Sequence, residues 1–132
     1  MNAPKRVNVM IVDDHSDTAR SMATLLELRG HRALCATDPR VALALVRDFE
    51  PDVAILDIGL PHMDGYELAM HLRVNGAQCR MIIVSGSAER DAQRCSRAGV
   101  ERFLSKPVDI DVLCAAVEIG STGISASCAA ST

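Results

Sequence analysis

The sequence of 132 residues is poor in aromatic side chains, with no tryptophan, one tyrosine and two phenylalanines. It therefore offers few rings on which nucleic-acid bases could stack. Basic residues form no block, and 17 acidic residues against 14 Lys and Arg give a net charge of −3. Because binding to a phosphate backbone needs clustered positive charge, we expect no direct contact with nucleic acid.

Long apolar runs and regularly spaced cysteine pairs are also missing. No hydrophobic stretch approaches the roughly 20 residues of a membrane span, so we expect no membrane insertion. The N-terminal segment leads into a short apolar run that ends at Asp13 and Asp14 and does not look like a signal peptide, so we expect a cytoplasmic protein. The five cysteines are odd in number and form no C-x-x-C, which favours buried thiols over disulfides or a zinc site.

Five short apolar segments alternate with stretches of helical periodicity. Strands are expected at residues 7–12, 31–35, 53–57, 81–84 and 100–104. Helices are expected to start at the capping residues Ser16, Asp38, Asp64, Ser87 and Asp109. This alternation predicts an α/β domain with a parallel, doubly wound sheet and helices on both faces. We expect that domain to occupy residues 1–119, and residues 120–132, which are small and polar, to form a flexible tail.

The third apolar segment ends abruptly at a carboxylate, Asp57. The run before it is apolar throughout, which predicts a strand buried on both faces. Gly59, Pro61 and the pair Asp64–Gly65 follow, and we expect Gly59 to let this loop turn close to the acid. A lone Asp at a strand end usually forms a turn or caps a helix, so the other strand ends decide its role.

Three other predicted strands end in polar residues, at Asp13–Asp14, Ser85 and Lys106. In an open parallel sheet these ends meet at one edge. Neighbouring carboxylates repel one another unless a cation joins them, and oxygen ligands of this kind suit Mg²⁺. Lys106 and Ser85 suit phosphoryl oxygens, which makes Asp57 a candidate nucleophile that forms an aspartyl-phosphate. Each residue also has a simpler interpretation, as a partner of a helix end, a turn or a solvated lysine, but all four together favour the site.

These motifs resemble the receiver (response-regulator) domain of two-component signalling. The matching segments are Val12-Asp13-Asp14, Leu56-Asp57-Ile58-Gly59-Leu60-Pro61-His62-Met63-Asp64-Gly65, Val84-Ser85-Gly86 and Phe103-Leu104-Ser105-Lys106-Pro107. The resemblance implies a flavodoxin-like fold, in which a five-stranded sheet of order 2-1-3-4-5 is flanked by five helices.

The resemblance also implies the roles of the site residues. Asp57 would accept a phosphoryl group from a histidine kinase or a histidine phosphotransfer protein. Asp14 and Asp57 would hold Mg²⁺, or Mn²⁺ in its place, with Asp13 acting through water and the Gly59 carbonyl completing the site. The domain would then catalyse only its own phosphorylation and dephosphorylation.

A conformational switch is implied as well. Lys106 and Ser85 would contact the phosphoryl group, and Phe103 stands at the position of the switch aromatic, where it gains packing but has no hydroxyl to donate. The fourth helix and fifth strand would present the signal to an unknown downstream protein. A thin stripe on that helix predicts weak anchoring; it consists of Ala88, Ala92 and Cys95. Its other faces would meet a partner or only water, and they carry Arg90, Arg94 and Arg97.

Several alternatives stay open. A haloacid-dehalogenase-like phosphatase also uses an aspartyl nucleophile, but it needs a second acid where this sequence has Gly59. A degenerate receiver that works without phosphorylation would not need the complete residue set. The chain would be a stand-alone regulator or a receiver cut from a hybrid histidine kinase, and a monomer or a weak dimer. The four histidines share no ligand-like spacing (15, 31, 62 and 71), and His15 either tunes the acidic site or belongs to a loop.

Overall fold

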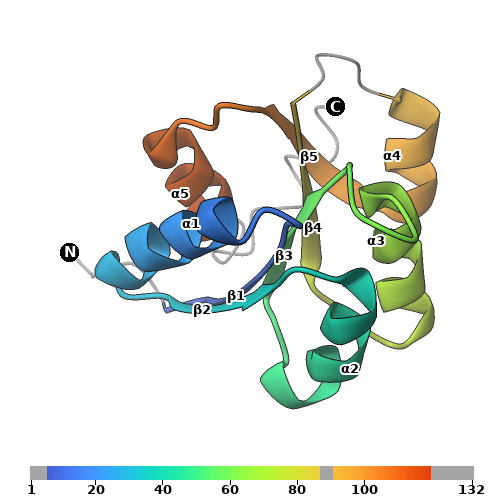
Figure 1. Ribbon diagram of the computed structural model, residues 1–132, viewed down its shortest axis with the longest axis horizontal. Helices are drawn as coiled ribbons and strands as arrows, with labels where there is room; N and C mark the ends of the chain where they lie inside the picture. The colour runs from blue at the N-terminus through green and yellow to red at the C-terminus, as the bar shows by residue number, and fades with distance from the viewer. Residues whose placement is uncertain (1–5, 87–90, 120–132) are drawn as a thin grey trace.

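The computed structural model describes residues 6–86 and 91–119, and these form one five-stranded parallel sheet between two layers of helices (Figure 1). The strands are β1 (Asn8–Val12), β2 (Arg32–Ala36), β3 (Val53–Asp57), β4 (Arg80–Ser85) and β5 (Val100–Ser105). The helices are α1 (Ser16–Leu28), α2 (Pro39–Phe49), α3 (Gly65–Val74), α4 (Ala92–Ala98) and α5 (Ile110–Ile119). The strand order β2-β1-β3-β4-β5 confirms the predicted fold class. The expected tail at 120–132 lies outside the described residues.

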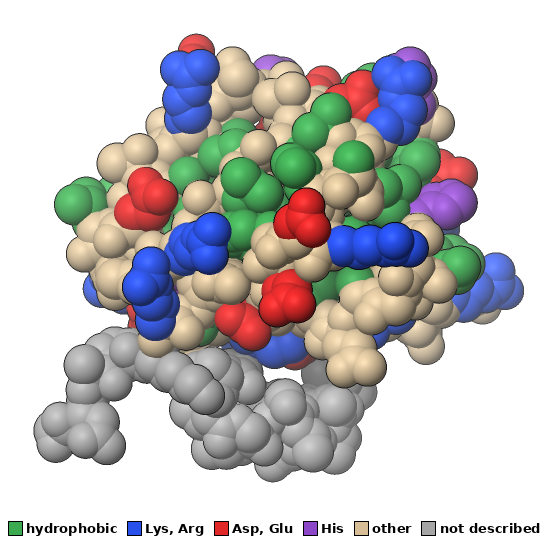
Figure 2. Space-filling view, turned by 90° about the horizontal axis from the view of Figure 1, so that it is seen from below, with side chains coloured by type: hydrophobic (Ala, Val, Ile, Leu, Met, Phe, Trp, Pro, Cys, Tyr) green, Lys and Arg blue, Asp and Glu red, His purple; other side chains and the backbone are tan. Residues whose placement is uncertain are grey.

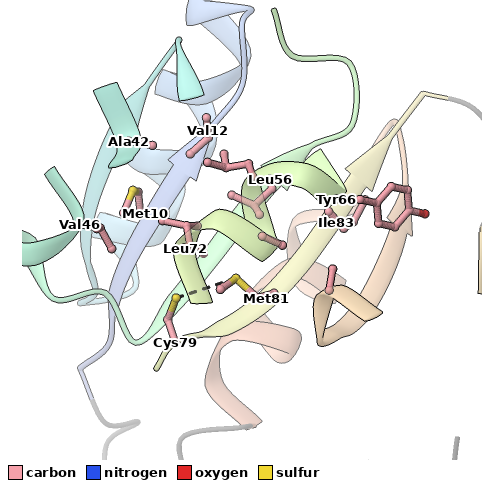
Figure 3. Packing of buried hydrophobic residues seen from close by; sticks show 14 of the residues in the cluster. Met10, Val12, Ala42, Val46, Leu56, Tyr66, Leu72, Cys79, Met81 and Ile83 are labelled. Carbon is pink, nitrogen blue, oxygen red and sulfur yellow. Dashed lines mark hydrogen bonds between the residues drawn. The ribbon is translucent and has the colours of Figure 1, made fainter. Parts of the chain in front are cut away.

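Alternate side chains of the inner strands face opposite layers. Val9 and Ile11 of β1 pack with α1 and α5, whereas Met10 and Val12 pack with α2, α3 and α4. Figure 1 shows the same division, with α1 and α5 on one side of the sheet and the other three helices across from them. Figure 3 shows the second cluster, in which Tyr66 lies at one end with its hydroxyl directed away from the other labelled side chains.

β3 lies in the middle of the sheet and is its most buried strand. All five of its residues are buried, including Asp57, because β1 and β4 pair with it on both sides and helices cover both faces. The prediction that this strand is apolar because it is buried on both faces is confirmed. It places Asp57 on a rigid support at the carboxyl edge of the sheet.

The helix starts agree with the sequence in three cases and differ in two; one of the three is Asp109, whose side chain accepts from the Asp111 amide at the start of α5. The Asp38 side chain accepts from the Arg40 amide, and Asp64 and Glu67 form a capping box, as predicted. Ser16 is not a cap: it is the first residue of α1, and His15 holds the cap position without a side-chain hydrogen bond. The serine lost this role because the Asp13 carboxylate accepts the His15 amide and so sets where the chain turns.

The start of α4 also differs from the prediction. Within the described residues the helix begins at Ala92, and the Asp91 side chain caps it by accepting from the Arg94 amide. The predicted cap Ser87, together with Ala88 and Arg90, lies outside the described residues. The apolar stripe is as thin as expected but is shifted, because Cys95 and Ala98 are buried whereas Ala92 is exposed.

The thiols, the helices and the surface charges can be compared with what the sequence predicted about disulfides, membrane spans and basic patches. Cysteines 35, 79, 95 and 114 are free thiols, and the last three are buried as predicted. In the described part of the chain, every helix is too short or too polar to cross a bilayer. On the face shown in Figure 2, Lys and Arg side chains of the described residues are interspersed with Asp and Glu and gather into no basic patch.

Candidate functional site

The carboxyl ends of β1, β3 and β5 bring three charged groups together, as the sequence predicts. The Lys106 ammonium lies 3.0 Å from Oδ2 of Asp13 and 3.5 Å from Oδ1 of Asp57. Asp13 is 1% exposed and Asp57 is 7% exposed, so both carboxylates are largely removed from water. Two buried acids beside one ammonium leave an excess of negative charge, which a further cation would offset.

Asp13 has hydrogen-bond donors on both of its oxygens. Lys106 binds Oδ2, and the His15 amide donates to Oδ1 at 2.9 Å. The His15 ring adds its Nδ1 at 3.3 Å from the same Oδ1. An acid held on both sides in this way is a fixed charge at the floor of the site and is less available as a nucleophile.

Asp57 is in a different environment. Burial raises the pKa of its carboxyl group and the nearby Asp13 charge raises it further, while Lys106 and a hydrogen bond from the Gly59 backbone pull it down. Its ionised form is thus less favourable than that of an acid in water. A cation bound beside it would restore that form.

Lys106 is tied to both the acids and the neighbouring strand. Burial lowers the pKa of its ammonium, but Asp13 and Asp57 outweigh this effect and the pKa is raised, which keeps the group charged. The Lys106 amide donates to the Ser85 carbonyl at 2.7 Å. Ser85 is 3% exposed at the end of β4, so the structure brings this serine to the same edge.

A glycine that the sequence had assigned only to a turn is fitted against Asp57. A Cβ on Gly65 would lie 2.6 Å from the Asp57 carbonyl oxygen, which is too close for any side chain. Among the described residues, a Cβ on Gly59 would meet no atom within 4 Å. The steric role predicted for Gly59 therefore belongs to Gly65, which lets the first turn of α3 pack on the backbone of the acid. Only the tertiary contact reveals this role.

The donor set fits a divalent cation. Ligand atoms from Asp13, Asp14, His15 and Asp57 all lie within 4.8 Å of one another. Asp14 is partly open to water, with a side-chain exposure of 37%, so a cation held here could keep water ligands. Two or three carboxylates with open positions suit Mg²⁺, which binds few protein oxygens and retains water. The sequence reasoning named the three acids but left His15 undecided.

Phe103 lies in β5 opposite Ile83 of β4. It is partly buried and packs against the α2–α3–α4 cluster. The structure thus places the predicted switch aromatic beside β4 and near the layer that contains α4.

Polar contacts between α3 and α4 were not foreseen. Nη2 of Arg94 lies 2.7 Å from Oδ2 of Asp64, and its guanidinium lies 4.6 Å from the centre of the Tyr66 ring. At the other end of α4, Arg73 donates to the carbonyls of Ala98 and Gly99. Arg94 is therefore not a freely solvated side chain, and α4 is held by α3 at both ends. From the sequence, only the capping role of Asp64 can be recognised. Its second partner, Arg94, is 30 residues away in the chain.

Comparison with known sequences assigns this arrangement to a family. The family model described as "Response regulator receiver domain" matches residues 9–118. The chain is 34% identical over 106 residues to Regulatory protein AtoC of Escherichia coli strain K12, which covers 80% of this chain and 23% of that protein. It is 36% identical over 115 residues to Virulence sensor protein BvgS of Bordetella pertussis, covering 81% of this chain and 9% of that protein. The chain thus spans less than a quarter of either relative.

Solved structures agree with this match. A CheY-like response regulator receiver domain protein from Methanospirillum hungatei superposes with a TM-score of 0.81 at 26% identity, covering 88% of this chain and 94% of that one. The receiver domain of Francisella response regulator 1452 gives 0.77 at 30% identity, covering 86% and 95%. With the predicted motifs at one edge of the predicted sheet, the chain belongs to the response regulator receiver domain family, whose members are phosphoacceptor switches.

Proposed function

We propose that Asp57 is the phosphoacceptor of this receiver, that it takes the phosphoryl group from a phosphohistidine donor with Mg²⁺, and that α4 and β5 pass the change to a downstream protein. One observation carries this proposal: the Lys106 ammonium lies 3.0 Å from Asp13 and 3.5 Å from Asp57 at a buried edge. A positive charge fixed beside a buried acid is what a phosphoryl group needs when it arrives there.

The transfer follows from these positions. An oxygen of Asp57 bonds to phosphorus, the bond from phosphorus to the donor's imidazole nitrogen breaks, and the electron pair stays on that nitrogen. Lys106 is placed to stabilise the charge on the phosphoryl oxygens, and the Ser85 hydroxyl to donate to one of them. A metal ion would add positive charge to offset that of the phosphoryl group; Asp14, Asp57 and the Gly59 carbonyl would hold it, with Asp13 acting through water.

The acceptor is tested with a small acyl phosphate and Mg²⁺. Intact mass should show one acid-stable, base-labile phosphate on the wild type and none on Asp57→Asn. Asp48→Asn, which removes an exposed acid of α2, serves as the matched control and should be phosphorylated like the wild type. An equal adduct on Asp57→Asn would contradict the assignment.

This receiver offers the donor protein a docking surface beside the site. A mainly apolar groove of about 600 Å³ runs between α1 and α5 and reaches Lys106; its lining includes Met22, Leu25, Val108, Ile110 and Leu113. We infer that the donor packs here while it presents its histidine to Asp57. Leu25→Arg should slow transfer from a phosphohistidine protein and leave acyl phosphate unaffected, whereas Leu28→Arg, outside the groove, should change neither. Equal slowing with both phosphodonors would contradict this docking site.

We expect the output face, which is formed by α4 and β5, to move together with α3. Asp64 caps α3 and binds Arg94 of α4, and the next residue, Gly65, packs on the Asp57 backbone. A change at Asp57 therefore has a short physical route to α4. Phosphorylation should alter hydrogen exchange in residues 92–98, and Arg94→Gln should weaken that response while Arg97→Gln, an exposed neighbour, leaves it intact. An unchanged response in Arg94→Gln would remove this ion pair from the switch.

A cytoplasmic location accords with the described thiols. Cysteines 35, 79, 95 and 114 are all free, which is typical of a reducing compartment.

A further inference from the structure

We propose that the His15 imidazole is a metal ligand of this receiver, and that it shifts the site's preference from Mg²⁺ towards Mn²⁺ and Co²⁺. This inference rests on the proposed metal site at the acids. The receiver motifs quoted above assign no role to the residue that follows the acidic pair.

The first argument is position. Nδ1 of His15 lies 3.2 Å from Oδ1 of Asp14 and 3.3 Å from Oδ1 of Asp13. The backbone directs the ring there, because the His15 amide donates to Oδ1 of Asp13 at 2.9 Å. The ring makes no capping hydrogen bond to α1, although His15 holds the cap position. Its nitrogen therefore faces the acids and not the helix.

The second argument is the division of Asp13 between two neighbours. Lys106 binds Oδ2 of Asp13, whereas His15 lies on Oδ1. The ammonium, which is needed for the phosphoryl group, and the imidazole are thus on different oxygens of the same acid. A metal bound among Asp13, Asp14, Asp57 and His15 does not have to displace Lys106.

The third argument is the freedom of the ring. His15 has 70% of its side chain exposed, and its Nε2 makes no hydrogen bond to protein within the described part of the chain. The neutral ring can carry its hydrogen on Nε2, facing water, and so leave the Nδ1 lone pair for a metal.

Nitrogen donation changes which metal is preferred. Carboxylates, carbonyls and water suit Mg²⁺, whereas imidazole binds the first-row transition metals better, in an order that rises from Mn²⁺ to Co²⁺. Adding one imidazole to the acids should strengthen Co²⁺ binding most, Mn²⁺ binding less and Mg²⁺ binding very little.

His62 supplies a matched control. It also lies in a loop and is 53% exposed, but Nη2 of Arg40 lies 3.0 Å from its Nε2 and it takes no part in the acidic cluster. His62→Asn and His15→Asn therefore remove the same chemical group from two loops of similar exposure.

The experiment measures metal binding without phosphorylation. Mn²⁺ affinity is read from the electron paramagnetic resonance of free Mn²⁺, Mg²⁺ affinity from competition with Mn²⁺, and Co²⁺ ligation from the paramagnetically shifted imidazole N–H resonance. His15→Asn should lower Co²⁺ affinity about tenfold or more and Mn²⁺ affinity severalfold, keep Mg²⁺ affinity within about twofold, and abolish the shifted resonance. His62→Asn should behave like the wild type.

Two results would overturn the inference. Unchanged metal preference in His15→Asn with the shifted resonance still present would show that the ring does not bind the metal. Higher affinity for all three metals in that variant would show that His15 only competes with the metal for the acids. In both cases the proposed function survives; it fails separately if Asp57→Asn binds Mg²⁺ as well as the wild type does.

Discussion

At the amino edge of the sheet, Arg80 binds Glu101 at 2.6 Å and donates to the carbonyls of Ala116 and Val117 at the end of α5. At the carboxyl edge, Asp13 and Asp57 share Lys106 with an excess of negative charge. The first arrangement satisfies its charges within the protein, whereas the second keeps an excess of negative charge that a cation would offset. Partly buried charges are thus paired at the amino edge, whereas the more buried acids at the carboxyl edge are left short of positive charge.

A second pair strengthens the contrast. His31 is fully buried at the amino edge, where its Nδ1 accepts from the Val7 amide and its Nε2 lies 2.8 Å from Glu118. His15 at the carboxyl edge is largely exposed beside two acids. The two histidines therefore lie in opposite environments, one enclosed by protein and one open to water beside the acids.

The largest effect should come from removing the amino-edge cation. Arg80→Ala leaves Glu101 without its partner and the end of α5 without its donor, so we expect the free energy of unfolding to fall by about 3 kcal/mol. Urea denaturation of the wild type, Arg80→Ala and the exposed control Arg20→Ala would measure this. A loss below about 0.5 kcal/mol, the size expected for the control, would erase the difference between the edges.

Metal should stabilise only the carboxyl edge. At about 100 times its dissociation constant, Mg²⁺ should raise the free energy of unfolding by about 2.7 kcal/mol, because it binds the folded state alone. Thermal melts with and without Mg²⁺ should show this gain in the wild type and in Arg20→Ala, and little of it in Asp57→Asn. An equal gain in all three proteins would place the bound cation elsewhere.

Without bound metal, removing the negative charge of Asp57 should stabilise the folded protein. The folded pKa of Asp57 is raised, chiefly by burial and then by Asp13, so the folded state holds the proton more tightly than the unfolded state does. Stability from this group is lost as pH rises from the unfolded pKa through the raised folded pKa, and it returns as pH falls. Asp57→Asn should therefore be more stable than the wild type at neutral pH, by about 1 kcal/mol.

The pH dependence of that gain provides the check. The advantage of Asp57→Asn should shrink as pH falls through the folded pKa, because the wild-type acid is then also neutral. Chemical denaturation in metal-free buffer at several pH values measures it. A variant less stable than the wild type at neutral pH would mean that the Lys106 contact outweighs the cost of burial.

The smallest effect should come from a neutral replacement at the amino edge. Because Nδ1 of His31 accepts from Val7, the neutral ring carries its hydrogen on Nε2 and donates it to Glu118. Glu118→Gln retains an oxygen acceptor, so we expect a change below about 0.5 kcal/mol. Urea denaturation at neutral pH would test this, and a loss of 2 kcal/mol or more would contradict it.

The sequence predicted the fold class and the convergence of the site because both depend on regular periodicity. Strands that alternate with helices form a parallel sheet, and the ends of parallel strands share one edge, so Asp13, Asp57, Ser85 and Lys106 had to meet. The capping box at Asp64 was equally predictable, since it is formed within four consecutive residues.

The remaining features depend on contacts between separate loops and helices, which no periodicity encodes. Tertiary packing alone decided that Gly65, and not Gly59, must lack a side chain beside Asp57. Tertiary packing also pairs Arg94 with Asp64 and places the His15 ring beside the acids. The sequence by itself determined which groups gather at the edge of the sheet; distances of a few ångströms between chain segments decided how those groups are held.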